Sequence, residues 1–495
     1  MNAGCGTLNK RQALLSSSFR VPRSAFLPLA SLLFCAALVL VIAPVRAAAQ
    51  SRRSQEAKRI LVISLDGLDW RYVSGARPNV RLPTLRRLMA EGVSSSVRTV
   101  YPSVTYPSHT SIVTGAYPAQ HGIYGNDIFD ASVLQNREWF WFANAIKVET
   151  LWDAAQRRHL STAMVSWPVA TGAGEVNVPE ILKFGGGFPA TLARMKANAR
   201  PQGLIEEIER ADPRLYALVN KDEQDDMRTR FAEYVIERKR PVVMLVHLFD
   251  LDHFEHEFGP FTPEAESVLE KTDAYVARLL AALERAGTLA ETAVFIVSDH
   301  GFLPIEKQIH PGVLLAQAGL LKLSEVRDSA GKTRLAVREW RAMPYCSAGS
   351  CAIILRDPED LGALNRARVI LRDFTEGLSP GLPAAGRGSL RVLEAREIRA
   401  LHANPRAALM LEASNGYTFG NNFTGEAVTP TSQRGTHGYL PSKYLNTFIA
   451  AGAGINRRGL INGSRPVPIV DLGPTMARVL RLKLRDAVGR AWPLR

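Results

Sequence analysis

Cysteine is scarce in this chain, with four residues in 495. So few thiols in so long a chain exclude a disulfide framework as the basis of the fold. The chain also lacks a dense basic block, although 61 lysines and arginines against 47 acidic residues give a net charge of +14. Scattered basic residues argue against dedicated nucleic-acid binding. A basic surface still favours the approach of a small anionic substrate.

Glycine and proline are not in excess, with 37 and 29 residues, and the sequence has no internal repeat. A collagen and a low-complexity scaffold are therefore excluded. Hydrophobic residues make up 46% of the chain and charged residues 22%, which is ordinary for a globular protein and excludes a disordered chain or a multi-span transporter. The length allows about three domains or one long α/β unit.

The first 49 residues have the pattern of a targeting segment. Four basic residues and no acid occur in residues 1–25, and an apolar run from Ala25 to Val45 leads to three alanines that end at Ala49. This pattern is typical of a secretory signal peptide. The apolar run is also about long enough to cross a bilayer, so an uncleaved N-terminal anchor is the alternative. In either case we expect residues 50–495 to be exported, periplasmic or extracellular.

Export bears on the last two cysteines. Cys346 and Cys351 are separated by Ser-Ala-Gly-Ser. In an oxidising compartment they can form a tight disulfide, which is the pairing we expect. The alternative is two buried thiols.

Short apolar runs alternate with helical patterns along the rest of the chain. The runs predict strands buried on both faces of a parallel sheet, and they cover residues 59–65, 162–166, 241–249, 293–298 and 446–450. Helices are expected at 83–91, 272–286 and 472–480. The alternation predicts an α/β fold with a doubly wound, mostly parallel sheet flanked by helices. Segments near 172–230 and 325–425 are expected to be cap-like insertions in a domain of residues 50–495.

Acidic residues and histidines follow the predicted strands. In open α/β sheets, ligands bind beyond the carboxyl ends of the strands. The residues in question are Asp66, Asp250, Asp252, His253, His256, Asp299 and His300, and His437 between two glycines. An acid at a strand end is often a helix cap, and a single histidine is usually structural. Carboxylates and imidazoles together are good zinc ligands, so the recurrence of the pattern favours a dinuclear metal site.

A threonine in residues 101–126 has the context of a nucleophile. Thr105 precedes Tyr106-Pro107, so a turn is expected to present its hydroxyl near the following helix. A neutral threonine is a poor nucleophile, and metal coordination is one way to activate it. The alternative role for Thr105 is a helix N-cap.

Eight segments, taken together, resemble the nucleotide pyrophosphatase/phosphodiesterase branch of the alkaline phosphatase superfamily. They are LDG at 65–67, PTL at 83–85, VTYPSH at 104–109, VTGAYPAQHGI at 113–123, DHFEHEFGP at 252–260, SDHGF at 298–302, GTHGY at 435–439 and DLGPT at 471–475. They occur in the order found in that family. Two positions depart from its pattern, because Tyr-Pro-Ser-His at 106–109 replaces Phe-Pro-Asn-His and Leu251 replaces a common proline. Neither departure touches a proposed ligand.

The resemblance implies an alkaline phosphatase-like fold with two divalent metal ions, expected to be Zn²⁺. Matched by position, one ion is held by Asp252, His256 and His437, and the other by Asp66, Asp299 and His300. Thr105 is the implied nucleophile between the ions, and Asn126 matches an asparagine that donates to a phosphoryl oxygen. His109 and His121 match positions with structural roles. We interpret Asp250 as a capping or outer residue, His253 as a surface residue and His310 as part of a loop.

The implied activity is hydrolysis of phosphodiester or pyrophosphate bonds in nucleotide-type substrates through a phospho-threonine intermediate. Alternatives are a phosphonate hydrolase or a phosphoglycerol-type transferase of the same superfamily, or, in a different class, a non-catalytic metal-binding surface protein. A sulfatase is disfavoured because Thr105 cannot become formylglycine. The aromatic residues Trp139–Phe142 either form a stacking surface for a base or aryl group or make a hydrophobic contact with the cap.

Overall fold

The computed structural model describes residues 56–494 except 182–186, 220–222, 328–330, 332 and 379–385. The chain divides into two compact units, residues 1–51 and 52–495, and the fold described below is that of the second. The predicted signal peptide or anchor at residues 1–49 lies outside the described residues. Within the described ranges, the helices are too short or too polar to cross a bilayer.

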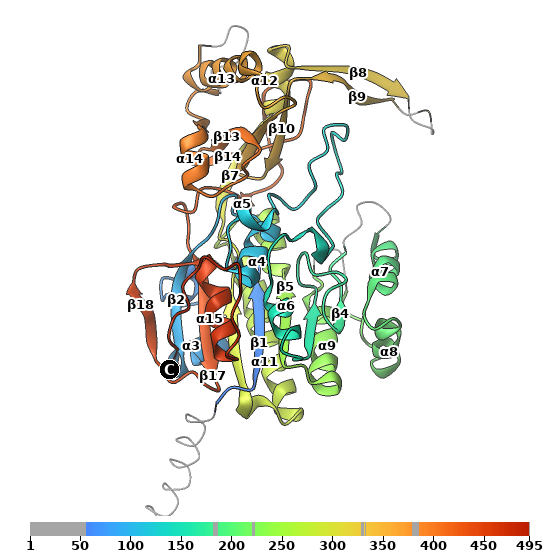
Figure 1. Cartoon of the computed structure of the whole chain (residues 1–495), viewed down its shortest axis with the longest axis vertical. Helices are drawn as coiled ribbons and strands as arrows, with labels where there is room; N and C mark the ends of the chain where they lie inside the picture. Colours follow the sequence, from blue (N-terminus) through green and yellow to red (C-terminus); the bar gives the residue numbers. More distant parts are fainter. Residues whose placement is uncertain are drawn as a thin grey trace, which may run out of the picture. The chain divides into compact units, whose positions relative to one another are not determined.

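A nine-stranded sheet forms the centre of this unit, with the order β18-β2-β17-β6-β1-β5-β3-β4 and with β19 also paired to β2 (Figure 1). The strands are β1 (Arg59–Leu65), β2 (Val93–Arg98), β3 (Thr162–Val165), β4 (Val176–Val178), β5 (Val243–Leu248), β6 (Thr292–Val297), β17 (Asn446–Gly452), β18 (Gly459–Ser464) and β19 (Val467–Pro468). Neighbouring strands are parallel except where β17 meets β2 and β6. The predicted doubly wound, mostly parallel sheet is therefore confirmed.

Both faces of the sheet are buried, which explains the continuous apolar runs. Along β1, Ile60 and Val62 belong to one hydrophobic core, and Leu61 and Ile63 belong to the other. The first core also contains residues of α4 (Thr105–Thr114), α6 (Leu151–Gln156) and α15 (Leu472–Val479). The second contains residues of α3 (Pro83–Glu91), α9 (Asp225–Tyr234) and α11 (Pro263–Arg285). Helices therefore cover both faces of the sheet.

Shorter elements complete the framework of the large sheet. They are α2 (Trp70–Val73), α5 (Pro118–His121), η1 (Ala143–Ala145), α7 (Gly187–Asn198), α8 (Leu204–Ala211), η2 (Val235–Lys239), α10 (Asp250–Phe258), η3 (Leu289–Glu291) and η5 (Ile469–Asp471). The segment 172–230, expected to be an insertion, contains β4, α7, α8 and the start of α9.

Smaller sheets lie between β6 and β17 in the sequence. Four strands pair in the order β10-β11-β13-β12, three in the order β14-β7-β15 with β16 also on β7, and β8 pairs with β9. The elements are β7 (Leu303–Ile309), α12 (Pro311–Gln317), β8 (Leu321–Arg327), β9 (Thr333–Trp340), β10 (Ala342–Ser347), β11 (Ser350–Leu355), α13 (Leu361–Glu376), β12 (Leu390–Leu393), α14 (Ala395–Ala400), β13 (Ala407–Ala413), β14 (Gly416–Phe419), β15 (Val428–Pro430) and β16 (Gly435–Thr436). Most of them, namely β7, α12, β10, β11, α13, β12, β13, β14 and β15, contribute residues to one hydrophobic core. We call residues 303–436 the small module (Figure 1).

Two pairs of residues join the two ends of the small module beside the end of the large sheet. Strand β7 leaves shortly after His300, and β16 returns immediately before His437. The two strands pair antiparallel, with Leu303 opposite Thr436 and Pro304 opposite Gly435. This pairing brings His437 close to His300, although 136 residues separate them in the sequence.

Most predicted elements agree with the structure to within two residues, but the predicted start of one helix is wrong. The expected helix 272–286 is α11, which begins nine residues earlier at Pro263. Thr262 caps it by accepting from Ala265 N, and Pro263 occupies the first position, where its missing N–H costs nothing. The apolar stripe used for the prediction is simply the later part of a longer helix.

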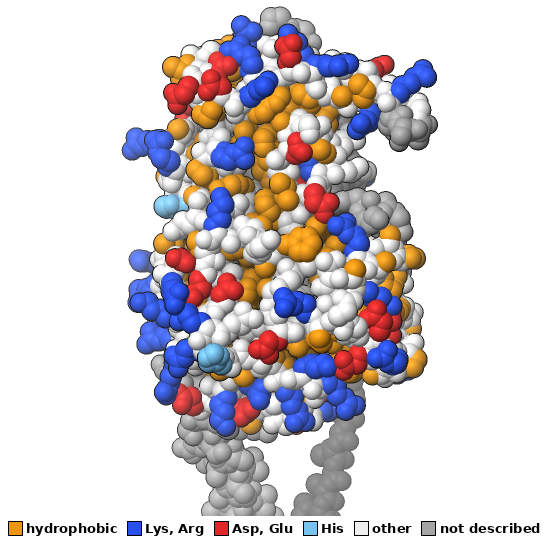
Figure 2. Space-filling view, turned by 45° about the vertical axis from the view of Figure 1, so that its right-hand side comes forward, with side chains coloured by type: hydrophobic (Ala, Val, Ile, Leu, Met, Phe, Trp, Pro, Cys, Tyr) orange, Lys and Arg blue, Asp and Glu red, His pale blue; other side chains and the backbone are white. Residues whose placement is uncertain are grey.

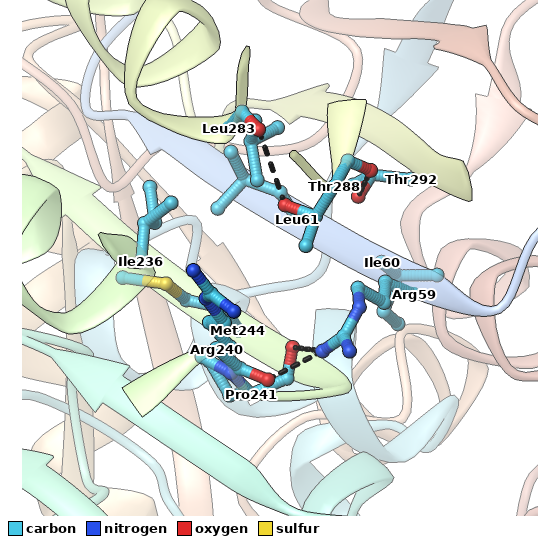
Figure 3. A pocket seen from close by; sticks show the side chains of 10 residues that line it. All are labelled: Arg59, Ile60, Leu61, Ile236, Arg240, Pro241, Met244, Leu283, Thr288 and Thr292. Carbon is cyan, nitrogen blue, oxygen red and sulfur yellow. Dashed lines mark hydrogen bonds between the residues drawn. The ribbon is translucent and has the colours of Figure 1, made fainter. Parts of the chain in front are cut away.

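A small cavity lies at the amino ends of β1, β5 and β6 (Figure 3). Its volume is about 10 Å³, which holds about one water molecule. Arg59 closes one side by donating to the carbonyl oxygens of Arg240 and Pro241. The cavity is at the opposite edge of the sheet from the acids and histidines singled out above, so it is not a substrate site.

Candidate active site

The carboxyl ends of β1, β5 and β6 bring together acids that are far apart in the sequence. Asp66 follows β1, Asp299 and His300 follow β6, and Asp252 lies in α10, which begins directly after β5. Because the three strands are parallel neighbours, these side chains meet at one edge of the sheet. His300 Nε2 lies 3.2 Å from Asp66 Oδ1, 3.1 Å from Asp299 Oδ2 and 3.8 Å from Asp252 Oδ1.

Two further histidines complete the cluster around Asp252. Its Oδ1 lies 3.6 Å from His256 Nε2 and 3.7 Å from His437 Nε2. Asp252 and His256 are four residues apart on α10 and therefore share a face of the helix, as the spacing predicted. The ring of His437 stacks on that of His300 at 3.7 Å between centroids. The structure thus places all six proposed ligand residues in one cluster.

Ligand atoms of the cluster fall into two groups with separations within 4.8 Å. One is Asp252, His256 and His437, and the other is Asp66, Asp252 and His300. The first contains the residues expected for one ion. In the second, Asp252 stands where Asp299 was expected, although Asp299 Oδ2 is close to His300. Asp252 is therefore shared by the two groups.

Backbone carbonyls orient two of the histidines. His256 Nδ1 donates to Gly435 O at 3.0 Å, and His437 Nδ1 donates to Ser103 O at 3.3 Å. Each ring consequently directs Nε2 toward Asp252. A histidine that ligates a metal almost always donates its other nitrogen in this way.

The electrostatics of the cluster match a site for cations. Within the described residues, Asp66 Oδ1, Asp252 Oδ1 and Asp299 Oδ2 are buried without a hydrogen bond. Burial raises the pKa of all three carboxyls, and the neighbouring Asp252 and Asp66 carboxylates raise those of Asp66 and Asp299 further. Burial and the adjacent imidazoles hold the pKa of His300 well below its ordinary value. Converging carboxylate oxygens and neutral imidazoles are the ligands Zn²⁺ prefers, so these residues fit divalent cations.

Thr105 lies beside the cluster as the first residue of α4. Its Oγ1 is 3.4 Å from His300 Nε2. The N-cap of α4 is Val104, so Thr105 does not have the capping role that was its alternative. His109, one turn later, donates from Nδ1 to Thr105 O at 2.8 Å, and its Nε2 accepts from Ser64 Oγ at 2.8 Å. These bonds anchor the start of α4 to the end of β1 and confirm a structural role for His109.

Asn126 lies against the same turn. Its Oδ1 accepts from Tyr106 N at 3.0 Å. Because that bond fixes the orientation of the amide, Nδ2 is the donor left for another partner. Asn126 is partly exposed, and its Oδ1 bonds to the residue that follows Thr105.

The arrangement of these site residues agrees with the protein family that the chain matches. The model of the type I phosphodiesterase / nucleotide pyrophosphatase family matches residues 60–440. The chain belongs to this family. The match includes the six cluster residues, Thr105 and Asn126.

Individual relatives within the family are distant. An uncharacterized pyrophosphatase/phosphodiesterase of Schizosaccharomyces pombe is 26% identical over 255 residues, which are 50% of this chain and 45% of that protein. The human bis(5'-adenosyl)-triphosphatase is 24% identical over 439 residues, covering 86% of this chain and 78% of that protein. Human ectonucleotide pyrophosphatase/phosphodiesterase 5 has a similar fold, with a TM-score of 0.59 and 18% identity over 87% of this chain and 97% of that chain. The chain thus spans less than half of the first of these relatives.

Two buried residues of the site escaped the sequence analysis. His247 lies in β5 and contacts Asp66 Oδ2 through Nε2 at 2.9 Å. Glu180, just after β4, contacts His247 Nδ1 at 3.3 Å. His247 is the one polar residue in the apolar run at 241–249, and that irregularity was the available signal. Glu180 lies in a segment without a clear pattern and had none.

The residues judged to lie outside the ligand set have the expected roles. Asp250 accepts from Gln224 N and Asp225 N at the start of α9, so it is a cap. His253 is partly exposed beside Glu257. His121 and His310 contact hydroxyls, those of Ser111 at 3.0 Å and Thr429 at 2.9 Å.

The aromatic run after Asn126 packs next to Thr105. Trp139 and Trp141 stack at 5.3 Å, and the ring of Tyr106 meets that of Trp139 edge-on at 5.3 Å. Trp141 is buried in a hydrophobic cluster with Tyr106, whereas Phe142 is exposed. Figure 2 shows other hydrophobic side chains along the middle of one face, between charged side chains. The run thus combines a packing role with an apolar surface near the site.

The predicted disulfide between Cys346 and Cys351 is present. It joins directly opposed residues of β10 and β11 in the small module. The turn between these strands contains Gly349, whose N–H donates to His437 O at 2.9 Å. The disulfide therefore braces the hairpin that contacts a residue of the cluster.

Glu412 provides a pH-dependent contact near His437. Its carboxylate accepts from Leu440 N at 3.0 Å, and burial raises its pKa to about 7 from 4.5. The folded protein therefore binds the proton of the Glu412 carboxyl more tightly than the unfolded chain does. This contribution to the free energy of unfolding is complete below pH 4.5 and is lost as the pH rises to about 7. We expect the free energy of unfolding of the wild type to fall, relative to Glu412→Gln, by roughly 3 kcal/mol across that interval. Denaturant unfolding in the presence of chelator at several pH values measures this free energy for both proteins, and Glu359→Gln, at an exposed position, is the control. A difference between the wild type and Glu412→Gln that stays constant with pH contradicts the prediction.

Proposed function

We propose that this protein is an exported hydrolase that cleaves phosphodiester or pyrophosphate bonds of nucleotide-type substrates with two divalent metal ions, most simply Zn²⁺. One observation carries the proposal. Six buried or half-buried acids and histidines, from segments spread over almost 400 residues, converge beside the hydroxyl of Thr105. Membership of the type I phosphodiesterase / nucleotide pyrophosphatase family supports the reaction class.

The cluster would hold the two ions through its two ligand groups, with Asp252 facing both and Asp299 beside His300. Divalent cations at such a site favour the alkoxide of an adjacent hydroxyl and neutralise charge on the phosphoryl and leaving oxygens. The contacts of His256 and His437 to backbone carbonyls keep their Nε2 atoms directed inward without further reorganisation.

Thr105 acts as the nucleophile in the proposed reaction. Its Oγ1 attacks phosphorus and forms a new P–O bond as the bond to the leaving oxygen breaks; the hydroxyl proton is released, and the leaving oxygen takes a proton from water. Water then attacks the phosphorus of phospho-Thr105, the bond to Oγ1 breaks, and the hydroxyl is restored. His109 holds the main chain at Thr105, so Oγ1 stays in place through both steps.

The charge of the site favours diesters and pyrophosphates over monoesters. The proposed machinery contains six ligand residues, one threonine and one asparagine, and no arginine to bind an additional phosphate charge. The exposed Phe142 and the partly exposed Trp139 and Phe140 offer an apolar surface to a base or aryl group. The names of the pyrophosphatase and triphosphatase relatives point to the same substrate class.

Metal analysis combined with a substrate panel tests the proposal. We expect about two equivalents of divalent metal, and turnover of a nucleotide diester and a dinucleoside polyphosphate well above that of a monoester. Exhaustive dialysis against chelator removes activity, and Zn²⁺ restores it. Preference for a phosphonate ester or for glycerol transfer would move the protein to the alternative reactions of the superfamily. Bound metal without turnover would identify a non-catalytic metal-binding protein, and full activity without metal would refute the mechanism.

Export is part of the proposal and has its own test. The disulfide in the small module indicates an oxidising compartment, and the predicted signal segment supplies a route. Cell fractionation should recover the protein outside the cytoplasm. Recovery in the cytoplasm with both thiols open to alkylation would refute export.

Asn126 is expected to stabilise charge on the phosphoryl oxygen. Asn126→Asp retains the oxygen that accepts from Tyr106 N but replaces the Nδ2 donor with an acceptor. Loss of one such donor lowers kcat by about 10²–10³-fold. Steady-state kinetics on a nucleotide diester measure this, with Asn144→Asp, at an exposed position, as the matched control. Wild-type kcat in Asn126→Asp would remove Asn126 from the mechanism.

A further inference from the structure

His247 is a buried polar residue at the inner edge of the cluster. In the register between β1 and β5, it is paired with Ser64, and the preceding pairs on the same face are Val62 with Leu245 and Ile60 with Val243. The pair of Ser64 with His247 is therefore the last one on this face and the first polar one, and it lies immediately before the site. His247 has 1% of its surface exposed, so its partners are protein atoms.

Both ring nitrogens of His247 face oxygen atoms. Nε2 lies 2.9 Å from Asp66 Oδ2. Nδ1 lies 3.1 Å from the carbonyl oxygen of Ser166 and 3.3 Å from Glu180 Oε1. One ring thus links Asp66 to the backbone of Ser166 and to Glu180, which leaves His247 little freedom to turn.

The contact with His247 gives the two carboxyl oxygens of Asp66 different roles. Oδ2 is held by His247, whereas Oδ1 has no hydrogen bond among the described residues and lies 3.2 Å from His300 Nε2 within a ligand group. One oxygen of Asp66 is thus fixed by the protein, and the other is directed into the cluster.

We propose that His247, supported by Glu180, is a positioning residue that orients Asp66 for metal binding. This inference rests on the proposed metal site. Neither residue touches the reacting atoms. Outer residues of this kind typically change metal affinity by 10–100-fold, and we expect that effect to fall on the ion bound by Asp66 and to leave the other ion in place.

Competition with a chromogenic chelator tests the proposal by measuring the affinity of each bound Zn²⁺ equivalent. His247→Leu is expected to weaken one of two equivalents by 10–100-fold. His247→Gln, whose amide can still donate toward Asp66, should recover part of that loss. His310→Leu is the matched control, because it removes another buried histidine that bonds to Thr429 and not to the cluster. It should bind both equivalents as the wild type does.

The outcomes separate this inference from the proposed function. A wild type that binds no Zn²⁺ contradicts the metal site itself. Two equivalents of unchanged affinity in a folded His247→Leu contradict only the role of His247. Circular dichroism of the metal-free variants establishes folding. If His247→Leu does not fold, Glu180→Gln decides the question: it retains the size of Glu180, and a weakened equivalent supports the proposal whereas wild-type affinity overturns it.

Discussion

Thr105→Ala is expected to reduce turnover of a nucleotide diester by at least about 10⁴-fold, the scale seen when a catalytic nucleophile is removed. The substitution deletes the Oγ1 atom beside His300, which is the proposed attacking atom. The backbone contact from His109 to Thr105 O does not depend on the side chain. Metal content and the thermal unfolding midpoint should therefore stay close to those of the wild type.

Two variants make the Thr105 result specific. Thr105→Ser retains a hydroxyl and should keep measurable turnover together with a phosphorylated intermediate trapped by rapid quenching. Thr110→Ala removes another buried threonine of α4, one that donates to Tyr106 O at 2.8 Å, and should leave turnover near wild type. Substantial activity in Thr105→Ala would show that water attacks the substrate directly.

Asp252→Asn is expected to lower the affinity for both metal ions by more than about 100-fold, beyond the range typical of outer residues. The reason is that Oδ1 of Asp252 faces three imidazoles, His256 at 3.6 Å, His437 at 3.7 Å and His300 at 3.8 Å. The amide is close in size to the carboxylate but lacks its charge. Activity should fall with metal occupancy and should not recover fully at high Zn²⁺.

The measurement for Asp252→Asn is metal stoichiometry after dialysis at fixed free Zn²⁺. Glu257→Gln is a suitable control, because it neutralises an exposed acid on the same helix, α10, that pairs with His253. The control should retain two equivalents. One equivalent retained at wild-type affinity in Asp252→Asn would show that Asp252 serves a single ion, as the family pattern implies.

The sequence was sufficient for the location of the site and for five of the nine strands of the main sheet, whereas β2, β4, β18 and β19 were not predicted. The run at 59–65 is almost wholly apolar because helices cover both faces of the sheet, so hydrophobic side chains point to either side of the strand. This pattern is visible without coordinates. Asp66 and Asp299 stand at strand ends, where parallel topology collects side chains at one edge. Their proximity in space follows from those two facts together.

Other features depend on contacts that local patterns do not encode. Glu180 and His247 meet although 66 residues separate them in the sequence, and nothing near Glu180 in the sequence marks it as part of a site. The sharing of Asp252 between two ligand groups depends on the angle at which α10 leaves β5. The start of α11 was missed because an apolar stripe marks the buried face of a helix, whereas Thr262 and Pro263 mark its beginning.

The pairing of β7 with β16 has a consequence for how such enzymes diversify. The small module begins at Leu303 and ends at Thr436, and these two residues pair with each other in that short ladder. His300 and His437 lie just outside it. The intervening 130-odd residues can therefore vary in size and shape without altering the cluster, provided that the two rungs and the contact from Gly349 N to His437 O are kept.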